Sequence, residues 1–460
     1  MRFSSAEVAA AVAGVLHGDD AAIEGVAIDS RRVGGGELFV PIVAERDGHD
    51  FITAAIERGA AAHLTGHPVE AGALRPAIAV ADTSTALLEI GRLARSRLPD
   101  RVVGITGSVG KTSTKDLLAA VLGRRFVTAA SARSFNNELG VPLTLANAPD
   151  ATEAMVIEMG ARGPGHIALL CDVARPTVGI VTTVIGAHLE MFGSIEAVAR
   201  AKAELIEGLP ATGTAVLNGD DPRVAAMAER ATASVLHFGE GGSDVRATGV
   251  TLDPDLRASF DLVTPWGSAR TTLAAHGRHQ VVNALAAATA ALVLGVDLDD
   301  VVAGLASAPI SAMRMDLVRM PNGAVVLDDA YNANPTSMQA ALDALATLDA
   351  DRRVAMLGTM AELGADGPRL HREVAAYAAR LGIRVVAVGE AAYAVDRGDM
   401  VDDVSDALDL LGDLGTGDVV LVKGSRVAAL ERLVAGLHGG QLPRRDSRRP
   451  SRDPKRSRRS

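Results

Sequence analysis

The stretch from Arg101 to Leu118 constrains this chain more than any other part of its sequence. It begins with a short β-branched apolar run, Val102 to Thr106, of the kind that forms a buried strand. Glycines then interrupt the run, and after Lys111 and Thr112 the apolar residues recur at helical spacing. A strand, a glycine turn, a Lys-Thr pair and a helix are the parts of a phosphate-binding loop. The sequence therefore predicts nucleotide binding at this turn.

In such a loop the backbone N–H groups turn inward around phosphate oxygens, and the N-terminus of the helix adds a favourable dipole. Lys111 is placed to reach the terminal phosphates of ATP, and the Thr112 hydroxyl to face Mg²⁺. The general motif has a glycine where Ile105 stands; here the nearby glycines are Gly104 and Gly107. We expect nucleotide contacts from Gly107, Ser108, Val109, Gly110, Lys111, Thr112 and Ser113.

Length and composition limit the class of protein. A chain of 460 residues suggests about three domains. No apolar run reaches the ~18 residues that cross a membrane, and Glu7 within the N-terminal apolar stretch argues against a signal peptide. Cys171 is the only cysteine, which excludes a disulfide framework and a thiolate metal cluster. We therefore expect a cytoplasmic enzyme that does not span a membrane.

The order of the expected elements indicates an α/β fold. Strands and helices alternate from residue 101 to about 309, which predicts a mostly parallel sheet with ligands at the carboxyl ends of its strands. Pro99-Asp100 is a boundary signal, and a third α/β unit begins near residue 310. We divide the chain into residues 1–97, 98–309, 310–440 and a tail, 441–460.

Several polar groups follow expected strands and are candidates for chemistry. Glu158 could bind Mg²⁺ through its carboxylate, and His188 follows the next strand, although each taken alone is more often structural. Asp328-Asp329 and the loop from Lys423 to Arg426 end strands of the third unit, which suggests a site closed between domains. Two loops near the N-terminus, 29–32 and 47–50, fit structural turns and binding equally well.

The ordered run of motifs resembles one family, the Mur ligases. The resemblance covers residues from about 25 to 437 and rests on TGSVGKTSTK, SFNNELGVPLTL, EMGARGPGHI, AHLEMFGS, AKAELIEGLP, DDAYNANPTSM, LGTMAELG and KGSR. It implies a substrate domain for a UDP-sugar, a central ATPase domain and a Rossmann-like C-terminal domain for the incoming amino acid. Among family activities, the motifs are most similar to those of ligases that add D-alanyl-D-alanine to UDP-N-acetylmuramoyl-tripeptide.

The resemblance also implies a reaction and its cofactors. ATP converts the tripeptide carboxylate to an acyl phosphate, which the amine of the dipeptide then attacks. By motif, Lys111 holds phosphates, Thr112 and Glu158 hold one Mg²⁺, and His188 and Lys202 serve a second, with the lysine carbamylated. From spacing alone, Lys202 would instead be a surface lysine paired with Glu196 or Glu207.

Further contacts follow residue by residue from the same resemblance. Asn283 matches the adenine-side helix, Arg314 an arginine on the ATP phosphates, and Asp329 a nucleotide contact from the third domain. The expected contacts with the other substrates are Ser30, Arg31 and His49 on the UDP side, Asn136 and Asn137 on the muramoyl-peptide side, and Lys423 and Arg426 near the acceptor. The implied partners are small molecules, with no nucleic acid required, and the implied state is a monomer.

The sequence departs from the family pattern at a few positions. Gln280 stands where the family usually has Asn, Met313 where it has Gly before the arginine, and Ala330 where it has Ser. The segment from Thr183 to Gly186 replaces a usual Asn-Ile-Gly-Pro. None of these changes removes a charged group from the implied site.

Other functions are open on the sequence alone. The chain could add a different amino acid by the same chemistry, or be a nucleotide-binding regulator with a degenerate ligase fold. The set of Lys111, Glu158, His188 and Lys202 argues against degeneration. A redox dinucleotide enzyme is disfavoured because Lys-Thr after the glycines suits a triphosphate.

Residues 441–460 form a basic tail whose deletion tests its role. The tail holds nine Lys and Arg against two Asp, a local charge of +7, which leaves −17 for the rest of a chain of net charge −10. Because it has almost no apolar side chains, we expect it to be disordered. Removing it should leave kcat and the melting temperature nearly unchanged in a coupled phosphate-release assay. A large fall in turnover would show that the tail belongs to the folded enzyme, whereas a salt-sensitive loss of membrane or partner association would identify an electrostatic tether.

Overall fold

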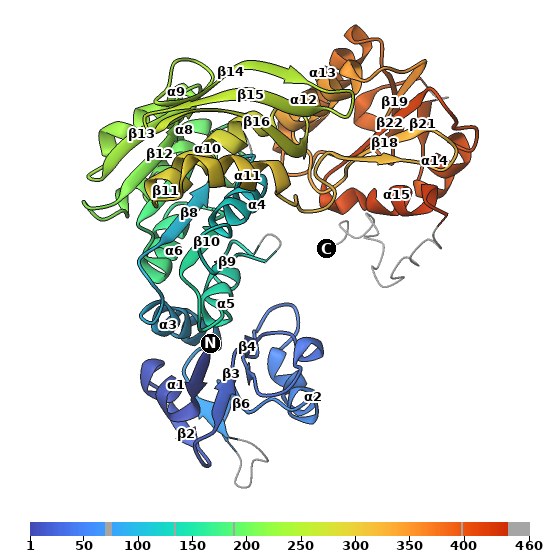
Figure 1. The fold of residues 1–460 in the computed structure, drawn as a ribbon. Helices are drawn as coiled ribbons and strands as arrows, with labels where there is room; N and C mark the ends of the chain where they lie inside the picture. Colours follow the sequence, from blue (N-terminus) through green and yellow to red (C-terminus); the bar gives the residue numbers. More distant parts are fainter. Residues whose placement is uncertain (70–75, 133–134, 187–188, 397–398, 440–460) are drawn as a thin grey trace.

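A computed structural model describes residues 1–69, 76–132, 135–186, 189–396 and 399–439. Figure 1 shows three bodies in chain order, each built on its own sheet: a small N-terminal body, a large central one, and a C-terminal one beside the central sheet. Across the described residues, no helix is long and apolar enough to cross a membrane. The basic tail and His188 lie outside the described residues.

The N-terminal body contains a five-stranded sheet within the described residues. Its spatial order is β2 (Val15–His17), β7 (Ala77–Ala79), β6 (Ala62–Thr65), β5 (Leu38–Phe39) and β4 (Val26–Ala27), with β4 to β7 parallel. A separate antiparallel pair joins β1 (Arg2–Ser4) to β3 (Ala22–Glu24). The helices are α1 (Ser5–Ala11), α2 (Ile52–Glu57) and α3 (Thr83–Arg95).

The strands β4 and β5 are both short, because the chain turns soon after each of them. After β4, the Asp29 side chain accepts a hydrogen bond from the Arg31 N–H and starts a 3-10 turn. After β5, Pro41 has no N–H to donate to a sheet. A second 3-10 turn, Gly48–Phe51, precedes α2.

The central body is built on a sheet of nine strands in the part of the chain that the structure describes. Their order is β16 (Gly267–His276), β15 (Arg257–Thr264), β14 (Val245–Leu252), β13 (Ser234–Gly239), β12 (Thr214–Asn218), β11 (Val178–Val181), β8 (Val102–Thr106), β10 (Ala154–Glu158) and β9 (Thr128–Ala130). Pairing is parallel from β9 to β14 and antiparallel beyond it. The mostly parallel α/β fold predicted for this region is confirmed.

Helices cover both faces of the central sheet because alternate strand residues point to opposite sides. On β8, Val102 packs into one core and Val103 into the other. The first core includes residues of α3, α5 (Gly140–Ala146), α6 (His166–Ala174) and α8 (Ile195–Glu207). The second includes α4 (Lys111–Leu122), α10 (Gln280–Val293) and α11 (Leu298–Ser307). The short helices α7 (Leu189–Phe192) and α9 (Pro222–Ala225) complete this body.

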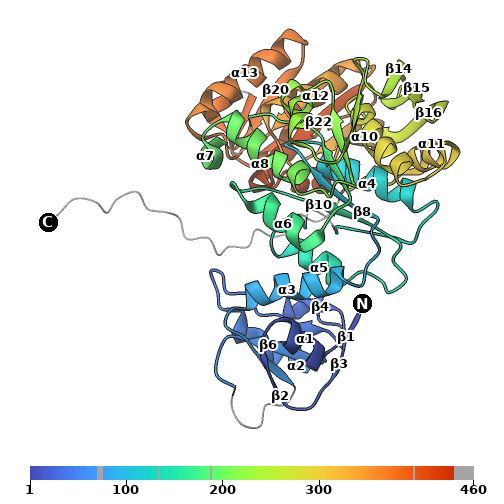
Figure 2. The ribbon, with the colours of Figure 1, turned by 90° about the vertical axis from the view of Figure 1, so that its left-hand side faces the viewer.

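Helix α3 connects the first two bodies by packing rather than by a loose linker. Gly91 lies so close to Pro142 of α5 that a Cβ there would fall 2.6 Å from the proline Cβ. Leu87 and Ile90 of α3 belong to the same apolar core as Met155 of the central sheet. Figure 2 shows α3 and α5 between the N-terminal sheet and the rest of the chain. The position of the N-terminal sheet is therefore set by a helix contact.

The C-terminal body has a sheet of six described strands. Their order is β17 (Asp316–Arg319), β18 (Val325–Asp329), β22 (Asp418–Lys423), β19 (Arg352–Leu357), β20 (Arg384–Val388) and β21 (Met400–Val401), all parallel except the pair β17–β18. The helices are α12 (Pro335–Thr347), α13 (Gly367–Arg380), α14 (Val404–Leu410) and α15 (Glu431–Leu437). Asp329 and Lys423 end neighbouring parallel strands, as the sequence predicts.

Candidate active site

The strand, glycine turn and helix that the sequence predicts here are confirmed, since β8 ends at Thr106 and α4 begins at Lys111. Gly107 has φ +147°, and a Cβ there would lie 1.8 Å from the Thr182 hydroxyl oxygen. Gly110 has φ +86° and stands at the helix N-terminus. Both positions therefore require glycine. The loop is tied to the next strand, because Ser108 N–H donates to the Thr183 carbonyl over 2.8 Å.

Lys111 folds back over its own loop. Its Nζ donates to the Gly107 carbonyl over 2.8 Å. Desolvation lowers the pKa of Lys111; the negative charge of Glu158 opposes this shift and the positive charge of Arg314 adds to it. The ammonium thus lies among protein atoms beside the glycine turn, where a bound anion would compensate its charge.

Thr112 and Glu158 form the centre of the site. The Thr112 hydroxyl donates to Glu158 Oε2 over 2.8 Å, and Asn136 Nδ2 donates to Glu158 Oε1 over 2.8 Å. Arg314 Nη2 donates to the Thr112 Oγ1 over 2.9 Å. Thr112 and Asn136 thus meet on the Glu158 carboxylate, and Arg314, from the segment before β17, reaches the same cluster through Thr112. Ser113 is buried in the next position of α4.

Arg314 also meets the third body. Its guanidinium lies 4.2 Å from the centre of the Tyr331 ring, which follows β18. Among the described residues its buried Nε has no hydrogen-bond acceptor. A buried donor without an acceptor is costly, so the group is suited to an anionic ligand such as a phosphate.

Lys202 is buried, which rules out the surface pairing with Glu196 or Glu207 that its spacing allows. Its side chain is 5% exposed, while Glu207 pairs with Arg230 over 2.6 Å and Glu196 lies 3.9 Å from Arg223. Burial, with a smaller contribution from the positive charge of Lys111, lowers the pKa of Lys202 to about 7. A substantial fraction of this lysine is therefore a neutral amine near neutral pH.

Asn283 lies beneath the glycine turn. It is buried on α10, and a Cβ on Gly110 would fall 2.4 Å from its Oδ1. Its Nδ2 donates to Gln280 Oε1 over 2.9 Å. The family departure at Gln280 therefore has a structural consequence, because the longer amide fixes the orientation of Asn283.

The residues expected at the acceptor end surround Lys423. Its buried Nζ lies 2.5 Å from Asp329 Oδ2 and donates to the Asn332 carbonyl over 2.9 Å. Arg426 is exposed and reaches Glu431 over 3.3 Å and the Met313 sulfur over 3.7 Å. Asp329 and Lys423 thus form one ion pair with little exposed surface. Arg426 follows the same strand, β22, and is not part of this pair.

The residues expected on the UDP side lie at the carboxyl ends of β4 and β5. Ser30 is buried in its turn, and Arg31 is exposed and paired with Asp29 over 2.8 Å. A cavity of about 730 Å³ opens between this turn and the central sheet, with Asp29 and Arg32 on one side and Thr128 and Phe135 on the other. The Asn137 Oδ1 accepts from the N–H of Gly140, the first residue of α5, over 2.9 Å.

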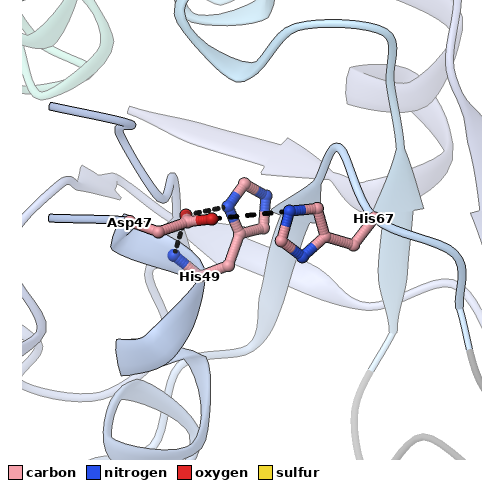
Figure 3. A group of neighbouring side chains, drawn as sticks. All are labelled: Asp47, His49 and His67. Carbon is pink, nitrogen blue, oxygen red and sulfur yellow. Dashed lines mark hydrogen bonds and ion pairs between the residues drawn. The ribbon is translucent and has the colours of Figure 1, made fainter.

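Asp47, His49 and His67 gather at the same sheet edge, as Figure 3 shows. His49 Nδ1 lies 2.5 Å from Asp47 Oδ1, and its Nε2 accepts from the Gly66 N–H over 2.9 Å. This pattern places the proton on Nδ1, so neither ring nitrogen has a lone pair free for a metal ion. His67 stacks on the His49 ring at 4.0 Å. Within this cluster His49 supports the loop, and its buried ring has little surface for a substrate.

Sequence reasoning missed several residues that shape the site. Met313 and Met315, on either side of Arg314, have φ of +63° and +61°. For Met313 the sequence did hold a signal, because it stands where the family has a glycine before the arginine. Lys115 and Asp116, one turn after the Lys-Thr pair, form an ion pair with little exposed surface, and Lys115 reaches the Ser131 carbonyl; their helical spacing gave no sign of either contact.

Comparison with known proteins agrees with this geometry. Three family models match in order: the Mur ligase family catalytic domain over residues 22–95, the Mur ligase middle domain over 105–291, and the Mur ligase glutamate ligase domain over 313–426. A UDP-N-acetylmuramoyl-tripeptide–D-alanyl-D-alanine ligase of Mycobacterium tuberculosis is 40% identical, over 90% of this chain and 91% of the relative.

The chain belongs to the Mur ligase family. This Mur ligase is also similar to the solved structure of MurF from Acinetobacter baumannii, with 31% identity, a TM-score of 0.87, and coverage of 95% and 99% of the two chains. It resembles MurF from Thermotoga maritima in complex with ADP, with 28% identity, a TM-score of 0.79 and coverage of 90% and 97%. The similarity extends over all three bodies of the Mur ligase described here.

Replacing Lys111 by Ala tests the phosphate loop. We expect the variant to fold but to ligate far more slowly. The activation free energy should rise by about 3–4 kcal/mol, because a charge-assisted contact in the transition state is lost. The measurement is ATP-dependent phosphate release, with circular dichroism to check folding. Arg124→Ala is the matched control, since Arg124 follows the other end of α4 and makes an exposed ion pair with Asp300. Normal turnover by a folded Lys111→Ala variant would contradict the assignment.

Proposed function

We propose that this Mur ligase joins D-alanyl-D-alanine to the carboxylate of UDP-N-acetylmuramoyl-tripeptide at the expense of ATP, in peptidoglycan synthesis. The observation that supports this most is the full-length similarity to ligases of that name, combined with a phosphate loop that Arg314 connects to the third body. The enzyme acts in the cytoplasm as a monomer, and no nucleic acid takes part.

The residues of the site suit this reaction. A carboxylate is a poor electrophile, so the γ-phosphate of ATP is first transferred to it, giving an acyl phosphate and ADP. The amine of the dipeptide then attacks the acyl carbon, and the tetrahedral intermediate collapses with release of phosphate. Lys111 and Arg314 neutralise the charge on the transferring phosphate, and Asn283 supports the loop that cradles it.

Mg²⁺ fits the oxygen atoms at the centre of the site. The Thr112 hydroxyl and the Glu158 carboxylate offer hard oxygen ligands 2.8 Å apart, the donor type that this ion prefers. Bound Mg²⁺ supplies charge neutralisation for the phosphates of ATP. His188 and Lys202 serve a second ion, and for Lys202 this requires a negative side chain. We infer that the neutral Lys202 amine reacts with CO₂ and loses a proton to give a carbamate.

The three bodies divide the remaining substrate contacts. Ser30 and Arg31 bind the UDP part at the edge of the N-terminal sheet, with His49 supporting their neighbouring loop. The muramoyl-peptide runs along the cavity between β4 and β9 towards Asn136, and Asn137 fixes the start of α5 beside it. Asp329 contacts the nucleotide, and Lys423 and Arg426 orient the incoming dipeptide. The peptide carboxylate and the dipeptide amine then meet at Glu158 and Arg314.

A substrate screen tests the function directly. We expect ATP-dependent phosphate release with UDP-N-acetylmuramoyl-tripeptide only when D-alanyl-D-alanine is present, and a product whose mass contains both. The screen includes shorter muramoyl peptides with single amino acids. Activity only with a single amino acid would identify another ligase of the same chemistry, and binding of ATP without turnover on any pair would indicate a non-catalytic homologue.

Lys202 variants test the carbamate. Lys202→Ala should fold and bind ATP but be nearly inactive, because the negative ligand is lost, and a small carboxylic acid in excess should restore part of the rate by filling the vacancy. Lys202→Arg, which keeps a positive charge and cannot form the carbamate, should be inactive without restoration. The measurement is phosphate release with and without acetate, alongside Lys111→Ala, which acetate should not restore. An active Lys202→Ala enzyme would refute the carbamate.

A further inference from the structure

The segment between α11 and β17, residues 308–315, carries Arg314 to the phosphate loop and holds a strained backbone. Met313 and Met315 both have φ near +60°, a backbone conformation that residues other than glycine rarely adopt. Such a conformation persists only where its surroundings fix it. Two contacts do so locally: Met313 N–H donates to Asp316 Oδ2 over 2.8 Å, and Tyr331 N–H donates to the Met313 carbonyl over 3.2 Å.

A third contact ties the same segment to the helix of the phosphate loop. Ser311 N–H donates to Asp116 Oδ2 over 2.8 Å, across 195 positions of sequence. The other carboxylate oxygen, Asp116 Oδ1, lies 2.9 Å from Lys115 Nζ. The side chains of Lys115 and Asp116 are only 5% and 11% exposed. This is therefore a buried charge pair, and its negative member also holds a backbone N–H of the linker.

The positions of the two anchors on α4 follow from helix geometry. Thr112 and Asp116 are four residues apart, so they lie on one face of the helix. Thr112 receives Arg314, and Asp116 receives Ser311. The linker thus runs along α4 and is attached at both ends of one helical turn. A shift at the Asp116 end would move Arg314 relative to the Thr112 hydroxyl.

Lys115 extends the contact to the central carboxylate. Its Nζ donates to the Ser131 carbonyl over 2.9 Å, and the Ser131 hydroxyl accepts from the backbone N–H of Glu158 over 3.1 Å. The Lys115–Asp116 pair therefore touches both the linker that carries Arg314 and the loop that supports Glu158. Both Arg314 and Glu158 are hydrogen-bonded to the Thr112 hydroxyl.

We propose that Asp116 is a positioning residue, which holds the linker on α4 so that Arg314 is aligned with the phosphate loop when ATP is bound. This role of Asp116 rests on the proposed function, because it requires that Arg314 acts on the phosphate of ATP. Among the described residues, the Asp116 side chain pairs with Lys115 and accepts from Ser311, one helical turn away from the Thr112 hydroxyl. Its effect passes through Ser311 to the linker and through Lys115 to Ser131.

The requirement is for a carboxylate rather than for a side chain of this size. Lys115 and the Ser311 N–H are both donors, and Asp116 offers one oxygen to each. An asparagine offers one oxygen and one NH₂ group, so in any orientation either Lys115 or the Ser311 N–H loses its contact with residue 116, although Lys115 keeps the Ser131 carbonyl. Asp116→Asn is therefore a nearly isosteric change that breaks one anchor. Asp297→Asn is the matched control, because Asp297 pairs with Arg125 just beyond the other end of α4 and is exposed.

The experiment combines hydrogen exchange with steady-state kinetics on the full chain. In Asp116→Asn we expect faster amide exchange in peptides covering residues 308–316, with unchanged exchange in the strands of the central sheet. We expect kcat to fall about ten- to hundredfold while KM for ATP stays within about threefold, since misalignment acts on the chemical step more than on ground-state binding. Asp297→Asn should change neither quantity.

A double-mutant cycle separates positioning from general destabilisation. If Asp116 acts through Arg314, adding Asp116→Asn to Arg314→Lys should lower kcat by less than about twofold further. Additive losses would overturn the proposal, as would faster exchange throughout α4 and the central sheet, which would mark a merely structural residue. Unchanged exchange at 308–316 in a folded Asp116→Asn protein would also overturn it. If the wild type ligates no substrate, the proposed function fails, and the exchange data still decide whether Asp116 anchors the linker.

Discussion

The site depends on positive charge held away from water. Lys111 lies over the glycine turn, and Lys202 is buried near it. Loss of hydration lowers the pKa of both ammonium groups. For Lys202, a change from 10.5 to about 7 corresponds to about 5 kcal/mol against the ammonium form. Between pH 7 and 10.5 the unfolded chain binds more protons at this lysine than the folded chain does. The loss of folding stability is therefore fully present below pH 7 and is relieved as the pH rises above 7. Bound anions, or loss of the proton, remove the same conflict.

This electrostatic need fits the way in which the central and C-terminal sheets direct strand ends to one region. The carboxyl ends of β8 and β10 bring the phosphate loop and Glu158 together within the central sheet. The third body adds Tyr331 and the Asp329–Lys423 pair from the ends of β18 and β22. Arg314, from the linker, contacts both bodies at once. The contacts of Arg314 with Thr112 and Tyr331 therefore depend on this arrangement of the two bodies.

Local sequence patterns predicted the elements that carry chemistry, and long-range packing decided the rest. The phosphate loop was predictable because its strand, glycines and helix are consecutive. The alternation of strands and helices gave the α/β class for the same reason. The burial of Lys202 was not predictable from its spacing, since α8 also carries Glu196 and Glu207, which find arginine partners elsewhere. The role of His49 also needed the structure, because its second ring nitrogen is taken by Gly66, which is 17 residues away. The sequence positions of Asp116 and Ser311 gave no indication that they meet.

Met313 shows how a departure from a family pattern can be absorbed. A left-handed backbone at a residue with a side chain costs on the order of 1 kcal/mol or more, and a glycine there would avoid it. In this chain both backbone groups of Met313 are hydrogen-bonded, one to Asp316 and one to Tyr331. Its sulfur also meets Arg426, a contact that glycine cannot make. The methionine therefore accepts a strained backbone, and its side chain connects the linker to the loop that carries Arg426. The same linker that must place Arg314 on the phosphate loop is thereby also coupled to the residue expected beside the incoming dipeptide.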